Sequence, residues 1–289
     1  MKDYIITTDT TSDLPSEYIA KHGITIIPLC YMIKDEVYGS GKEMDIKDFY
    51  SLMRSGTMPT TMACVPNQVH DIFEGFIKKG YDILHISFSS ALSSSYNNSV
   101  MVANELMEQY PDSKINVVDS LCASMGEGLL VHKAVIKKEA GASLDEVTTW
   151  LEDHKLNLCH QFTVDSLFHL HRGGRVSKAT AIVGTLINVK PVLHVDNEGR
   201  LIPLCNVRGR KKSLTTLVDN MAKSLEGYTG ENDDIFIGHG DCLEDAMYVG
   251  SLIKERFGID NITYNYISPT IGTHSGPGTV ALFFMGNTR

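Results

Sequence analysis

The strongest constraint on the fold is a repeated order of short β-like runs, polar turns and helical patterns. Apolar runs typical of strands occur at residues 4–8, 81–88, 115–118, 235–237 and 262–267. Between such runs, apolar residues recur at helical spacing, as on the face that runs from Leu92 to Tyr110. Strands that alternate with helices predict an α/β fold.

The remaining segments complete this expectation. Asp45 begins a helix, and Ser143 and Glu146 have the spacing of a capping box. Further expectations are one β run over 24–33, a loop over 58–66, helices at 67–79, 126–139 and 179–187, a hairpin around 196–199, and a loop over 270–278.

The chain has 289 residues, which suggests about two domains. The strand–helix pattern begins again near Lys155. We therefore predict an N-terminal α/β domain over 1–155, which carries Thr61 and Ser93, and a C-terminal α/β domain over 156–289, which carries Arg175 and His274.

Polar clusters follow several predicted strands, at residues 9–12, 89–95, 119–120, 238–241 and 272–278. Ligands in open α/β sheets bind at the carboxyl ends of the strands. One such cluster is ordinary loop polarity, but five of them indicate a cleft at this edge.

The stretch 89–96 has five serines in its first seven residues and joins a predicted strand to a predicted helix. Hydroxyl groups and the unpaired N–H groups of a helix start suit an anion or a carboxylate. The alternative is a serine N-cap with solvated neighbours, which is the commoner role of a lone serine there.

The other candidate ligand-binding residues are isolated in the sequence, and each of them also has an ordinary structural role as an alternative. His274 lies among glycines, so its imidazole is able to donate to a carboxylate or to bond within its own loop. Arg175 follows two glycines and is either an anion ligand or a solvated side chain, and Thr61 is either a ligand or a helix cap. Arg208 and Arg210 stand in a basic run that is by default a solvated helix start.

Several function classes are disfavoured. The formal charge of −9 and the lack of a basic stripe argue against nucleic-acid binding. P-loop, Rossmann, nucleophile-elbow and HExxH motifs are absent from the sequence. His239 and Cys242 have no third ligand at suitable spacing, so we expect no metal site. We expect no membrane-spanning segment, no signal peptide, free buried thiols and a cytoplasmic location.

Short motifs follow one another along the whole chain, at residues 8–15, 89–96, 119–120, 173–175, 190–193, 208–212 and 272–278. Taken in this order, they resemble the DegV family of bacterial fatty-acid-binding proteins. Two pieces depart from the family pattern: its S-G-T-Y reads Ser93-Ser94-Ser95-Tyr96 here, and its T-S-Q-P reads Thr61-Met62-Ala63-Cys64.

The resemblance implies two α/β domains with one long-chain fatty acid buried between them. Thr61, Ser93 and His274 would bind the carboxylate, with Arg175 and Ser94 near the same polar end. The chain would be a carrier and not a catalyst, with the bound acid as its ligand and no cofactor.

The resemblance also implies partners. A separate ATP-dependent fatty acid kinase would dock at Arg208 and Arg210 and convert the acid to an acyl-phosphate for phospholipid synthesis, with an acyltransferase as a further partner. Two alternatives stay open: an enzyme that acts on a small phosphorylated or hydroxylated metabolite with His274 or His239 as acid–base, and a regulatory module with incidental lipid.

Overall fold

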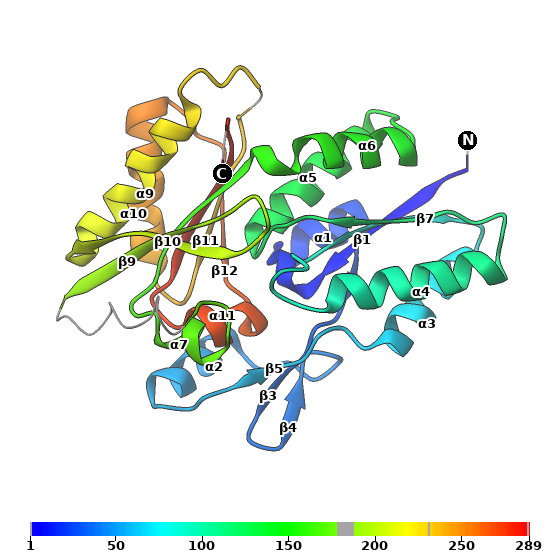
Figure 1. The fold of residues 1–289 in the computed structure, drawn as a ribbon, viewed down its shortest axis with the longest axis horizontal. Coiled ribbons are helices and arrows are strands. Elements are labelled where there is room, and N and C mark those ends of the chain that lie inside the picture. Colours follow the sequence, from blue (N-terminus) through cyan, green and yellow to red (C-terminus); the bar gives the residue numbers. More distant parts are fainter. Residues whose placement is uncertain (1, 178–187, 231, 288) are drawn as a thin grey trace.

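The computed structural model describes residues 2–177, 188–230, 232–287 and 289, and the helix expected at 179–187 lies outside this part of the chain. Its strands form two large sheets and one small sheet, with helices around them (Figure 1). This arrangement confirms the mixed α/β class. The domain seam near Lys155 stays a prediction.

The first sheet is parallel and belongs to the first half of the chain. Its strand order is β2-β1-β6-β7, and α3 and α4 pack against it through the core around Phe73 and Leu106. Because all four strands run the same way, their polar carboxyl ends meet at one edge, where Ser87 pairs with Asp119. Its elements are β1 (Tyr4–Asp9), α1 (Ser16–His22), β2 (Thr25–Ile27), α3 (Pro66–Ile77), β6 (Asp82–Ser87), α4 (Ser95–Gln109) and β7 (Ile115–Asp119).

The second sheet is mixed and belongs to the second half. Its order is β10-β9-β8-β13-β11-β12, in which β11 and β12 pair in parallel and the other neighbours pair antiparallel. The predicted hairpin joins β9 to β10. Its elements are β8 (Leu158–Thr163), β9 (Val189–Val195), β10 (Leu201–Arg208), α9 (Arg210–Leu225), β11 (Ile235–His239), α10 (Leu243–Phe257), β12 (Ile262–Tyr266) and β13 (Val280–Met285).

Alternation along β13 separates two faces of this sheet. Val280, Leu282 and Phe284 pack under α9 and α10, whereas Ala281 and Phe283 join the core on the opposite face. That second face meets α5 (Met125–Glu139), which lies between the two large sheets and is followed by α6 (Leu144–His154). One continuous core therefore joins the two halves, with α5 between the two large sheets (Figure 1).

The sequence did not predict the small third sheet. The expected single run over 24–33 is wrong: it divides into β2 in the parallel sheet and β3 (Tyr31–Ile33) in the small sheet. Pro28 stands at the break, where its missing N–H cannot join a ladder. The small sheet also contains β4 (Glu36–Tyr38) and β5 (Thr60–Thr61), so the segment expected as a loop over 58–66 includes a short strand that pairs with β3. Helix α2 (Ile46–Arg54) packs on this sheet with Asp45 as N-cap.

Two further expectations need correction. The loop expected over 270–278 contains α11 (Pro269–Ser275), because proline favours the first turn of a helix and Gly276 ends it. The helix expected from Leu92 begins only at Ser95, and its buried face carries Ser95, Ser99, Val102, Ala103 and Leu106. Ser95 and Ser99 can be buried because their hydroxyls have hydrogen-bond partners: Ser95 contacts Cys64 and Ser93, and Ser99 contacts Cys64.

Candidate functional site

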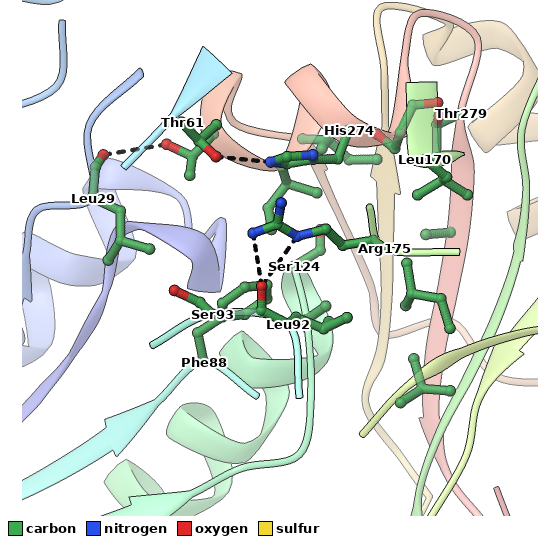
Figure 2. Close-up of a pocket in the computed structure, with 18 of the residues that line it drawn as sticks. Leu29, Thr61, Phe88, Leu92, Ser93, Ser124, Leu170, Arg175, His274 and Thr279 are labelled. Atoms are coloured by element: carbon green, nitrogen blue, oxygen red, sulfur yellow. Dashed lines mark hydrogen bonds between the residues drawn. The ribbon is translucent and has the colours of Figure 1, made fainter. Parts of the chain in front are cut away.

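A cavity of about 180 Å³ lies between the two halves of the chain (Figure 2). That space holds on the order of a dozen water-sized groups. Its walls come from both sides of Lys155 and are mostly apolar. The apolar lining residues are Leu29, Met62, Ala63, Phe88, Leu92, Ala123, Phe162, Leu170, Val195, Leu201, Ile267, Ile271, Ala281 and Phe283.

One long wall of the cavity follows from strand geometry. Thr279, Ala281 and Phe283 line it at alternate positions along and just before β13, and Phe162 and His160 continue it on the paired strand β8. Four residues of extended chain span about 13 Å. His160 is buried at this apolar end: its Nε2 accepts from the backbone N–H of Ala123 at 3.3 Å, and its Nδ1 has no hydrogen-bond partner among the described residues.

The opposite end of the cavity is polar and reaches the surface. Thr61, Ser93, Arg175 and His274 are half-buried there, and Ser94 is exposed, whereas Phe283 at the other end is buried. The three residues predicted to bind a carboxylate thus lie around one opening, together with both residues expected near them. They come from β5, the β6–α4 turn, the segment after α7 (Phe168–Arg172), and α11.

Thr61 and His274 are in direct contact. The Oγ1 atom of Thr61 lies 2.8 Å from Nε2 of His274, across 213 residues of sequence. Strand β5 presents Thr61 because it pairs with β3 through Tyr31. Of the two roles considered for His274, bonding within its own loop is therefore not the one seen (Figure 2).

The imidazole of His274 is neutral at physiological pH. Burial, together with the positive charges of Arg175 and Arg172, lowers its pKa to about 3. A neutral ring carries one N–H and one lone pair, so Nε2 either accepts from Thr61 or donates to it, and in the second case the Thr61 hydroxyl is free to donate to a carboxylate.

Arg175 connects the two halves beside this opening. Its Nε and one terminal nitrogen donate to the carbonyl of Leu92 at 3.1 and 2.9 Å, and the other donates to the carbonyl of Gly173 (Figure 2). The guanidinium therefore fixes the turn before Ser93 and supplies positive charge near His274.

Ser93 and Ser94 differ in their surroundings. The Oγ of Ser93 lies 2.9 Å from Oγ of Ser95 and accepts from the backbone N–H of Ser95 at 3.2 Å. Ser94 is the N-cap of α4, but its side chain forms no cap hydrogen bond. Ser93 is thus held in place, and the capping role considered for this serine run belongs partly to Ser93 itself.

The two arginines assigned to docking are not equivalent. Arg208 is exposed at the end of β10. Arg210 is turned into the fold: its Nε donates to Asp245 at 2.8 Å, and a terminal nitrogen donates to the carbonyl of Gly278 at 2.6 Å.

A group of buried carboxyls lies behind the cavity wall. Asp13 accepts from the hydroxyl of Ser124, a lining residue, and from the backbone N–H of Ser268, the N-cap of α11. Burial raises the pKa of Asp13 to about 7 and that of Glu127 well above its usual range. Asp13 was noted in the sequence only as part of a motif; nothing in its local sequence shows that it reaches α11.

The other candidate residues lie away from the cavity lining. His239 is buried on β11, where its Nδ1 accepts from the backbone N–H of Cys242. Among the residues that the structure describes, no cluster of three His, Cys, Asp or Glu side chains has the geometry of a metal site. Every helix in the described ranges is too short or too polar to cross a bilayer.

The sequence matches the family model described as "uncharacterised protein, DegV family" over residues 4–287. This chain belongs to the DegV family. The DegV domain-containing protein CPE0026 of Clostridium perfringens is 40% identical over all of this chain and 99% of that protein. The DegV domain-containing protein YteA of Lactococcus lactis is 36% identical over 96% of both chains.

Solved DegV structures have the same fold. A DegV family protein from Thermus thermophilus, described by its fatty acid binding, superposes with a TM-score of 0.84 at 28% identity, over 99% of this chain and 100% of that one. DegV from Bacillus subtilis, described as a fatty acid binding protein, gives a TM-score of 0.83 at 27% identity over the same shares.

Both departures of this DegV chain from the family pattern lie beside the opening. Cys64 and Ser95 are buried, and the backbone N–H of Cys64 donates to Oγ of Ser95 at 3.2 Å. Sequence reasoning identified each as a substitution but gave no sign of this contact, because the residues lie on different segments.

Proposed function

We propose that this DegV chain binds one long-chain fatty acid in the cavity, with the carboxylate at Thr61, Ser93 and His274 and the acyl chain along β8 and β13. The observation that supports this most is the polarity of the cavity. Thr61, Ser93 and His274 gather at the open end, and apolar side chains form most of the remaining lining.

The free energy expected from burial of an acyl chain agrees with such a ligand. Burial of about 14 methylenes at ~0.8 kcal/mol each contributes about 11 kcal/mol before the costs of association. A carboxylate at the edge of an apolar cavity needs hydrogen-bond donors to compensate for lost water. The hydroxyl of Ser93 and the hydrogen-bonded pair of Thr61 and His274 supply donors, Arg175 adds positive charge nearby, and Ser94 lies at the outer rim.

The open end also suits presentation of the carboxylate to a partner. In our proposal, an ATP-dependent fatty acid kinase reaches the carboxylate there. One carboxylate oxygen attacks the terminal phosphorus of ATP, the bond to ADP breaks, and the acyl-phosphate passes to an acyltransferase for phospholipid synthesis. The chain itself would carry the acid in the cytoplasm and leave the chemistry to the kinase.

Arg208 is the better placed of the two docking arginines, since its side chain is exposed. Arg210 would serve the same surface indirectly, because it is bonded to Asp245 and to the carbonyl of Gly278.

Mass spectrometry of the denatured, purified protein tests the ligand. We expect a long-chain acid at near one per chain, and Ser93→Ala should retain less of it after exchange with fresh acid. Ser51→Ala, at an exposed position of α2, is the matched control. Absence of lipid from the purified chain, with no uptake of palmitate or oleate on reconstitution, would contradict the proposal and favour a small-metabolite enzyme.

The docking role needs a separate measurement. Arg208→Glu should leave acid binding unchanged and lower the rate at which a DegV-dependent kinase forms ADP with the loaded chain. An unchanged rate would remove Arg208 from the docking surface.

A further inference from the structure

The hydroxyl of Ser93 belongs to a short buried chain of hydrogen bonds. The backbone N–H of Cys64 donates to Oγ of Ser95 at 3.2 Å, and Oγ of Ser95 lies 2.9 Å from Oγ of Ser93. The backbone N–H of Ser95 donates to the same Ser93 oxygen at 3.2 Å. Ser95 is fully buried, whereas Ser93 lines the open end of the cavity.

The two backbone donors decide the direction of the bond between the hydroxyls. A serine hydroxyl has one proton and two lone pairs. At Ser95, the N–H of Cys64 takes one lone pair, and Ser93 is the other hydrogen-bond partner of this oxygen in the described chain. If Ser93 were the donor, the buried proton of Ser95 would have no acceptor within those residues, which is costly.

The opposite direction, with Ser95 as donor, gives both serine hydroxyls suitable partners. When Ser95 donates to Ser93, the Ser93 oxygen accepts from the hydroxyl and the N–H of Ser95, and its own proton is left free. That proton faces the cavity side, where a ligand oxygen can accept it. A carboxylate offers only acceptors, so this direction turns Ser93 into a donor at the point where one is needed.

Cys64 is held firmly enough to impose this direction. Its Sγ donates to the carbonyl of Ser95 at 3.5 Å, and its own carbonyl accepts from Nδ2 of Asn98 at 2.9 Å. These bonds attach the segment that carries Thr61 to the first turns of α4. The N–H of Cys64 therefore points at Ser95 through contacts that are independent of any ligand.

We propose that Ser95, oriented by the backbone N–H of Cys64, is a positioning residue that directs the hydroxyl proton of Ser93 toward the carboxylate. The effect on ligand affinity rests on the proposed fatty-acid function, whereas the direction of the hydrogen bond does not.

Ser95→Ala tests the effect on a bound acid. We expect the affinity for palmitate to fall by up to about 10-fold, because Ser93 keeps its proton but no longer receives the hydrogen bond that directs that proton toward the carboxylate. The carboxyl of [1-¹³C]palmitate, followed by NMR, should also take up its proton at higher pH than in the wild type. Ser95→Thr keeps the hydroxyl, and Cys64→Ala keeps the N–H and the stronger bond of its carbonyl to Asn98, so both should resemble the wild type.

A double variant separates this role from simple packing. If Ser95 acts through Ser93, adding Ser95→Ala to Ser93→Ala should not weaken binding further. An unchanged carboxyl titration in folded Ser95→Ala, or additive losses in the double variant, would overturn the proposal. Failure of the wild type to bind any acid would instead contradict the proposed function.

Neutron diffraction from the ligand-free, deuterated chain decides the direction even if Ser95→Ala does not fold. The expected result is the Ser95 deuterium between the two Oγ atoms and the Ser93 deuterium toward the cavity. A Ser93 deuterium directed at Ser95 would overturn the proposal.

Discussion

The backbone of Gly173 lies directly against the imidazole of His274. A Cβ atom on Gly173 would lie 2.0 Å from Nδ1 and 2.8 Å from Cε1 of that ring. Glycine thus lets α7 and α11 approach closely enough to hold His274 beside Thr61.

Gly173→Ala should displace this ring and lower the affinity for a fatty acid by at least about 10-fold, since the contact is far inside van der Waals distance. Isothermal titration with palmitate measures the change. Gly75→Ala, in α3, is the control: a Cβ there meets nothing within 4 Å, so affinity should be unchanged. Equal affinities for Gly173→Ala and the wild type would show that the ring has room to move.

Thr61→Val should weaken fatty-acid binding by about 10-fold, because it keeps the shape of the side chain and removes one hydroxyl. It also leaves Nε2 of His274 without its 2.8 Å partner. Thr60→Val provides the comparison, since its exposed side chain lies on the other face of β5. A competition assay with a fluorescent fatty acid would show the difference; similar losses for both variants would contradict a specific role for Thr61.

Asp13→Asn should change how stability depends on pH. Burial raises the pKa of Asp13 to about 7. Between about pH 4 and 7, the folded chain therefore holds a proton that the unfolded chain has released, and the free energy of unfolding falls as pH rises.

Over this pH window, the titration of Asp13 lowers the free energy of unfolding by at most about 4 kcal/mol. Asn cannot titrate, so the variant should gain stability relative to the wild type between pH 5 and 7.5. Urea denaturation at the two pH values measures the change. Parallel pH profiles would mean that Asp13 keeps its ordinary pKa.

Asp234→Asn should destabilise the contact between α5 and the second sheet by about 3 to 5 kcal/mol. Nζ of Lys133 lies 2.6 Å from Oδ2 of Asp234, and Nε2 of His132 lies 3.3 Å from the same oxygen. Replacing the carboxylate leaves the buried ammonium of Lys133 unpaired. Denaturant titration at pH 7 measures the loss.

Lys133→Met in the Asp234→Asn background should restore part of that stability, because the unpaired charge is removed. His132 and Lys133 hold the pKa of Asp234 well below its ordinary value. The stabilisation is therefore present above about pH 4 and is lost as pH falls toward the lower, folded-state pKa. A double variant as unstable as Asp234→Asn would argue against the ion pair as the cause.

Local sequence patterns predicted most of the elements correctly. The runs at 4–8, 81–88 and 115–118 form the parallel sheet, and Ser143 and Glu146 form the expected capping box. These features depend on neighbours a few residues apart. The expectation at 24–33 was wrong because the same β-branched run serves two sheets, and that choice depends on strands far away in sequence.

The sequence alone determined the alternation of strands and helices, the serine turn before α4 and, through the family pattern, the prediction that Thr61, Ser93 and His274 bind a carboxylate. Tertiary structure decided where these side chains lie and what they contact. It places Thr61 against His274 across 213 residues, turns Arg210 toward Asp245, and joins the two substituted positions, Cys64 and Ser95, by a hydrogen bond. The reason is physical: side-chain type and local periodicity depend only on residues that are near one another in the sequence, whereas hydrogen-bond partners and burial depend on which distant segments pack together.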